Sequence, residues 1–228
     1  GWTSILVRLG VAGAFMILVA EYKANKHGDE DARRLAKRWS KVLAVTFAVG
    51  AVTGTVLTFE FGLLWPRFMG RFGDAFGIPF GIEGLFFFLE AIFLAIYLYG
   101  WDRLSPRAHW WSGVPIVVAG IGGTASVIAA NAWMNQPAGF TLNAAGKVVK
   151  VEPLRVIFNR AFPYETASML IAACLVGGCM LASGCAVATL RGRRDRCHRL
   201  ACPIALTSPA VSSLLQMAAR KHVARSAG

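Results

Sequence analysis

The chain has 228 residues, of which 56% are hydrophobic and only 16% are charged, and its formal net charge is +12. A soluble domain usually carries about 25% charged residues, so this composition excludes an ordinary soluble globular protein. The basic residues lie between long apolar runs, which is typical of membrane topology signals and argues against nucleic-acid binding.

Apolar runs recur along the chain at the length of about 20 residues that a helix needs to cross the hydrocarbon core. We predict an all-α, polytopic transmembrane helix bundle that forms a single membrane domain over residues 1–228. Its five spans and a weaker sixth are expected at 2–22, 42–64, 79–101, 110–133, 166–190 and 200–219. The sixth contains Pro203 and Pro209, so an irregular tail is the alternative there.

The start of the chain also carries information. The first apolar run is too long for a cleavable signal peptide and has no basic leader. Because the chain does not begin with Met, we expect it to begin inside a longer gene product.

Basic residues in the loops predict the orientation. The loops at 23–41, 102–109 and 191–199 hold fourteen Lys and Arg residues, whereas those at 65–78 and 134–165, with the C-terminal tail, hold nine. The first set should therefore be cytoplasmic, which places the N-terminus on the outer side of the membrane. The segment FTLNAAGKVVKVEPL in the longest loop could form a short external hairpin.

Small residues and cysteines are expected to pack helices. The runs VGAVTGTV, AGIGGTAS and GGCMLASG allow helix backbones to approach closely in lipid, and room for a flat cofactor is the alternative. The cysteines form no CxxC pair and have no His at zinc-site spacing, so we interpret them as small apolar residues. They are Cys174, Cys179, Cys185, Cys197 and Cys202.

The span at 79–101 carries the strongest chemical signal, because it contains Glu83 and Glu90 and no basic residue before its end. Seven residues correspond to a rotation of about 700° and a rise of about 10.5 Å, so both carboxylates share one helix face. Each ionised acid near the bilayer centre costs on the order of 2.5–3.5 kcal/mol. The pair indicates steps of a proton path or the lining of a redox cofactor pocket. Solvation near the interface is the alternative, more so for Glu83.

Other polar residues in the spans give weaker signals. Glu60 is expected to be interfacial, Arg8 to reach the interface or pair with an acid, and Asn131 to bond a helix end or a cofactor. Tryptophans near span ends are expected to form an aromatic belt: Trp65, Trp101, Trp110, Trp111 and Trp133. All histidines fall in predicted loops or the tail, so we expect solvated surface positions for His27, His109, His198 and His222.

The ordered motifs FEFG, EG…FFLE, YGWDR and NAWMNQPAGF closely resemble subunit I of the cytochrome bd quinol oxidases. The resemblance covers nearly the whole chain and is strongest from about residue 40 to 165. It implies an enzyme that transfers electrons from a membrane quinol to dioxygen through haem b and haem d, in a heterodimer with a second membrane subunit. It also implies that Glu83 and Glu90 deliver protons beside the haem d site and that Asn131 and Trp133 line that region.

The positions of the haem ligands depart from the family pattern. The resemblance places Thr3 and Ser168 where the family has haem-ligating histidines, and hydroxyls are not customary axial ligands for haem iron. The quinol-binding loop and the other Met and Glu ligands of the family fall beyond residue 228. Oxidase activity is therefore not expected from this chain alone, and no metal site is predicted. The alternatives are a non-catalytic membrane scaffold or decayed paralogue, and a small proton-conducting transporter.

Overall fold

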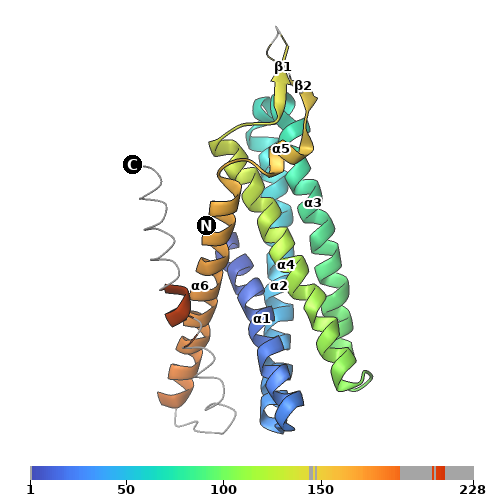
Figure 1. Cartoon of the computed structure of the whole chain (residues 1–228), viewed down its shortest axis with the longest axis vertical. Helices are drawn as coiled ribbons and strands as arrows, with labels where there is room; N and C mark the ends of the chain where they lie inside the picture. Colours follow the sequence, from blue (N-terminus) through green and yellow to red (C-terminus); the bar gives the residue numbers. More distant parts are fainter. Residues whose placement is uncertain (1, 144–145, 147, 191–206, 208, 214–228) are drawn as a thin grey trace.

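The structure, a computed structural model, describes residues 2–143, 146, 148–190, 207 and 209–213. Five long helices lie roughly side by side in this part of the chain, and a small hairpin projects from one end (Figure 1). The long helices are α1 (Trp2–His27), α2 (Glu30–Leu64), α3 (Pro66–Tyr99), α4 (Pro106–Asn135) and α6 (Phe162–Leu190). The short elements are β1 (Phe140–Leu142), β2 (Val148–Val151) and α5 (Pro153–Ile157).

The predicted spans can be compared with these helices. Among the described residues, four helices are long and apolar enough to cross a membrane, namely α2, α3, α4 and α6 over Phe162–Gly184. The spans at 42–64, 79–101, 110–133 and 166–190 lie in these helices. The span at 2–22 is helical in α1, but α1 is not among the four, so the count of five spans is not confirmed. The segment at 200–219 lies largely outside the described residues.

The expected loops at 23–41 and 65–78 are wrong, because both segments are almost entirely helical. Gly28 makes the turn between α1 and α2 with a φ of 62°, a value that glycine adopts readily. Asp29 then caps α2, since its carboxylate accepts hydrogen bonds from the backbone N–H groups of Asp31 and Ala32 at 3.0 and 3.3 Å. Hydropathy marks where lipid can lie and gives no information on how far a helix continues beyond it.

The core has two parts along the length of α3. Near the C-terminal end of α3, Leu94 and Tyr97 pack with Leu18 and Ile17 of α1 and Ile116 of α4. Near its N-terminal end, Phe76 packs with Trp133 of α4, and further aromatic rings surround them, including Phe61, Phe68, Phe72, Phe80 and Phe140. The Phe-rich sequence of α3 therefore supplies packing at both levels.

The aromatic belt is only partly as expected. Trp65 and Trp111 are exposed by 53% and 65%, as interfacial residues would be. Trp101 and Trp133 are buried instead, and Trp110 is half-buried with its Nε1 donating to the Leu18 carbonyl at 3.1 Å. The prediction is wrong for Trp101 and Trp133 because each lies where two helices meet.

The expected hairpin is confirmed, and its position outside the membrane stays a prediction. Strands β1 and β2 pair antiparallel, with Phe140 opposite Val151 and Thr141 opposite Lys150. From α3, the Arg71 guanidinium donates its Nε–H to the Gly146 carbonyl at 2.6 Å. This bond attaches the hairpin to the N-terminal part of α3. The face of α3 that carries Glu83 and Glu90 is called the acid-bearing face below.

Candidate functional site

Glu90 lies where α1, α3 and α4 meet. It is half-buried, and a Cβ atom placed on Gly120 of α4 would lie 3.7 Å from Glu90 Oε1 and 3.5 Å from Cγ2 of Val11 in α1. The absence of a side chain at Gly120 thus leaves room for the carboxylate against the α4 backbone. This acid faces the interior of the bundle, as the sequence predicts.

Glu83 lies two helical turns from Glu90 toward the N-terminal end of α3 and is also half-buried. Between the two acids, Phe86 packs so closely on Gly122 that an added Cβ would lie 2.6 Å from its ring. The hydroxyl of Thr124 on α4 is buried without a hydrogen-bond partner in the described part of the chain. This segment of α4 therefore presents glycines to Glu90 and Phe86 of α3.

Asn131 and Trp133 lie at another level of the bundle. Asn131 is about 16.5 Å further along α4 than Gly120, given a rise of about 1.5 Å per residue. Its Nδ2 donates to Glu165 Oε2 of α6 at 3.0 Å, and Asn135 donates to Glu165 Oε1 at 3.2 Å. Trp133 instead donates its Nε1–H to the Ala138 carbonyl, in the segment that follows α4, at 2.9 Å. The structure does not bring these two residues together with Glu90.

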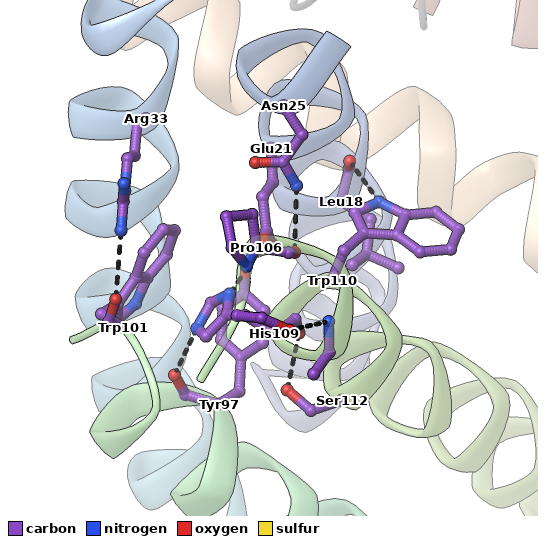
Figure 2. Close-up of polar contacts among 12 residues, drawn as sticks. Leu18, Glu21, Asn25, Arg33, Tyr97, Trp101, Pro106, His109, Trp110 and Ser112 are labelled. Carbon is purple, nitrogen blue, oxygen red and sulfur yellow. Dashed lines mark hydrogen bonds and ion pairs between the residues drawn. The ribbon is translucent and has the colours of Figure 1, made fainter. Parts of the chain in front are cut away.

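A buried polar cluster near the other end of the acid-bearing face was missed by the sequence analysis (Figure 2). Glu21 of α1 accepts hydrogen bonds from the Tyr97 hydroxyl of α3 at 2.5 Å and pairs with His109 Nδ1 of α4 at 2.7 Å. His109 Nε2 lies 2.9 Å from the Tyr97 carbonyl oxygen. An acid at position 21, inside the predicted span 2–22, was the signal that could have found it.

The predicted surface position of His109 is wrong, because the residue is only 3% exposed. The expected span began at 110, whereas α4 begins at Pro106, with the Ser105 hydroxyl accepting from the Ala108 backbone N–H at 3.4 Å. His109 is therefore in the first turn of a helix that packs on α1. His27 is exposed as expected, and His198 and His222 lie outside the described residues.

Comparison with known proteins identifies the family. The family model described as "Cytochrome bd terminal oxidase subunit I" matches residues 2–227. The chain belongs to the cytochrome bd oxidase subunit I family.

Individual bd oxidase relatives agree with this assignment. The chain is 36% identical over 94% of its length to a Bacillus subtilis (strain 168) protein named "Putative cytochrome bd menaquinol oxidase subunit I", of which it covers 49%. It is 26% identical over 92% of its length to the "Cytochrome bd-II ubiquinol oxidase subunit 1" of Escherichia coli (strain K12), covering 40% of that protein.

A solved structure of a bd oxidase, from Geobacillus thermodenitrificans, matches with a TM-score of 0.88 and 32% identity. The match covers 95% of this chain and 52% of that one. The chain thus spans about half the length of the bd oxidase relatives it matches.

Among the described residues, no imidazole inside the helix bundle is free to ligate a haem. Two histidines are described: His109 has both ring nitrogens engaged within the polar cluster, and His27 is exposed at the C-terminal end of α1. Ser168 lies half-buried in α6 and has a partner, and Thr3 lies in the first turn of α1. The described part of the chain also contains no group of three or more His, Cys, Asp or Glu residues that could hold a metal ion.

Proposed function

We propose that this chain acts as a subunit I component of a cytochrome bd-type oxidase, which transfers electrons from a membrane quinol to dioxygen. Its membership of the family and its similarity in fold to a bd oxidase support this assignment. A heterodimer with a second membrane subunit, a bilayer environment and quinol as the electron donor belong to the same proposal. The N-terminus is placed outside the plasma membrane on the distribution of basic residues.

Within this assembly, we infer that Glu83 and Glu90 hold and deliver protons. The observation that carries this inference is the position of the Glu90 carboxylate, beside the Gly120 backbone and inside the bundle. Ionisable side chains in membrane spans are costly and are usually retained for proton or ion transfer. Dioxygen reduction consumes protons, so an acid-bearing face inside the bundle suits this reaction.

Haem b and haem d are the cofactors expected for the family, and they would supply the redox chemistry when bound. No electron-transfer step is assigned to residues of this chain, because the described residues provide no free imidazole inside the helix bundle: His109 is engaged and His27 is exposed at the end of α1. Asn131 and Trp133 remain candidates for lining a haem pocket, on the strength of the family motif alone.

Proton transfer can be tested with the purified chain in liposomes that contain a pH-sensitive dye and carry an imposed potential. We expect the wild type to conduct protons and Glu90→Gln to abolish the flux. Glu60→Gln is the matched control, because Glu60 is an exposed acid of α2, and flux should be unchanged. Equal flux in wild type and Glu90→Gln would remove Glu90 from the proposed route.

Haem binding is tested by the absorption spectrum of the dithionite-reduced protein minus that of the oxidised protein. A featureless spectrum would favour the alternative of a non-catalytic scaffold, which Thr3 and Ser168 at the family's ligand positions already favour. Stoichiometric haem α-bands would support the oxidase and would require other ligands. Proton flux without haem would favour the proton-conducting transporter.

A further inference from the structure

The cluster of Glu21, Tyr97 and His109 joins three helices at one end of the acid-bearing face. Its members come from α1, α3 and α4 and are exposed by only 2%, 1% and 3%. Glu21 uses both carboxylate oxygens, one toward the Tyr97 hydroxyl and one toward His109 Nδ1. Such contacts are directional, whereas the apolar contacts around them tolerate sliding.

The hydrogen bonds determine how many protons the cluster holds. The Tyr97 backbone carbonyl can only accept, so His109 Nε2 carries a proton. The 2.7 Å contact between His109 Nδ1 and Glu21 Oε1 needs one further proton, because otherwise a lone pair would face a carboxylate oxygen. The pair therefore retains one shared proton and no net charge.

The surroundings favour that proton on the imidazole. The His109 ring packs against the rings of both Tyr97 and Trp101, with centroid separations of 4.3 and 4.2 Å, and aromatic rings attract a cation. In the described part of the chain, two cations of α2 have partners other than Glu21: the Arg33 guanidinium donates to the Trp101 carbonyl, and the Lys37 ammonium group donates to the Asp102 carboxylate. His109 is therefore the group that neutralises Glu21 there.

The same cluster is aligned with Glu90. Tyr97 follows Glu90 by seven residues on α3, so the two side chains share one face. On α4, Gly113 lies against the Tyr97 ring and Gly120 against the Glu90 carboxylate, again seven residues apart. Between the Tyr97–Gly113 contact and the Glu90–Gly120 contact the helices pack through apolar side chains, including Leu94 and Ile116. The hydrogen bonds at Tyr97 therefore determine the position of α3 along its axis, and with it the position of Glu90 relative to Gly120.

We propose that the hydrogen bonds joining Glu21 to Tyr97 and His109 lock α1, α3 and α4 in register and thereby hold Glu90 against Gly120, with one shared proton making the bond between Glu21 and His109. Glu21, Tyr97 and His109 are positioning residues in this scheme. The proposal rests on the proton-transfer role proposed above for Glu90.

The shared proton is tested by ¹⁵N NMR of the full chain in detergent micelles, labelled at histidine and assigned with His109→Leu. We expect His109 of the wild type to be protonated at both nitrogens, because the Tyr97 carbonyl and Glu21 both accept from the ring. In Glu21→Gln, the amide N–H can donate to Nδ1, so His109 should become neutral with the proton on Nε2. A wild-type His109 with a single protonated nitrogen would overturn the proposal.

The positioning role is tested by proton flux together with unfolding in detergent. We expect His109→Leu to destabilise the protein, because it leaves Glu21 buried without its cation, and the double variant Glu21→Leu with His109→Leu to regain stability. The double variant should nevertheless conduct protons several times more slowly, because the directional bonds are gone. Glu21→Gln, which keeps every bond, should conduct like the wild type.

The outcomes separate this proposal from the one on which it rests. Wild-type flux in the stable double variant would show that the cluster only stabilises the fold and would overturn the positioning role. Unchanged flux in Glu90→Gln would instead contradict the proposed role of Glu90, whatever the NMR spectra show. Abolished flux in Glu90→Gln with slowed flux in the double variant supports both.

Discussion

At the residue scale, the surroundings of Glu90 depend on a position that has no side chain. Gly120 allows the carboxylate to approach the α4 backbone, with ordinary van der Waals distances for a single added carbon. Residue type and spacing predicted that Glu83 and Glu90 share one face of a helix, but they could not show which residue of another helix would contact Glu90. That partner is decided by how α3 and α4 pack.

Enlarging Gly120 should displace Glu90. We expect Gly120→Ala to be tolerated and Gly120→Leu to cost about 1–3 kcal/mol of unfolding free energy through overpacking. Proton flux in liposomes should fall in the Leu variant alone. Gly50→Leu on α2 is the control, since no atom lies within 4 Å of a Cβ placed there. Wild-type flux in Gly120→Leu would contradict the assignment of the carboxylate to this contact.

A second residue-scale prediction concerns Glu165, whose carboxylate accepts from Asn131 and Asn135. Glu165→Ala should lower the unfolding free energy by about 1–2 kcal/mol, because two hydrogen bonds to a charged group are lost at a partly exposed site. The measurement is denaturant unfolding in detergent. Glu152→Ala is the matched control, because its ion pairs with Lys150 and Arg155 are exposed and should contribute little.

At the element scale, helix ends separate the sequence prediction from the structure. The basic segment at 23–41 was expected to be a loop because it is polar, yet only Gly28 and Asp29 lie between α1 and α2. The helices continue because buried apolar residues such as Ala32, Leu35 and Ala36 extend the packed face of α2. Capping residues would have located this boundary better than hydropathy.

Removing the cap of α2 should have a modest effect. Asp29→Ala should cost about 1 kcal/mol of unfolding free energy, because the backbone N–H groups of Asp31 and Ala32 lose their acceptor. Asp29→Asn retains an acceptor oxygen and should remain near the wild type. Thermal unfolding in detergent measures both, and a full loss of stability in Asp29→Asn would show that the charge of Asp29 matters more than its cap.

At the scale of the whole molecule, the ends of the bundle carry different polar elements. One end carries the hairpin of β1 and β2 and the Phe-rich core, and the other carries the α1–α2 turn and the cluster of Glu21, Tyr97 and His109. In Figure 1 the hairpin and the α1–α2 turn lie at opposite ends of the long axis. The predicted topology assigns the hairpin to the outside.

This topology can be measured by labelling with a membrane-impermeant thiol reagent in right-side-out vesicles. In a background whose native cysteines are replaced by Ala, Thr141→Cys in β1 should be labelled from outside. Lys23→Cys near the end of α1 should be labelled only after the vesicles are opened. The reverse pattern would show that the excess of basic residues does not determine the orientation of this chain.

The sequence by itself determined the membrane environment, the family and the presence of two acids on one face of α3, because apolar length, ordered motifs and a spacing of seven residues are local properties of the chain. Only the tertiary structure decided that Trp101, Trp133 and His109 are buried and that Glu21 is the partner of His109. The two residues are 88 positions apart, and their contact exists only because α1 and α4 pack side by side. Hydrogen bonds between distant segments depend on helix register, which no local pattern specifies.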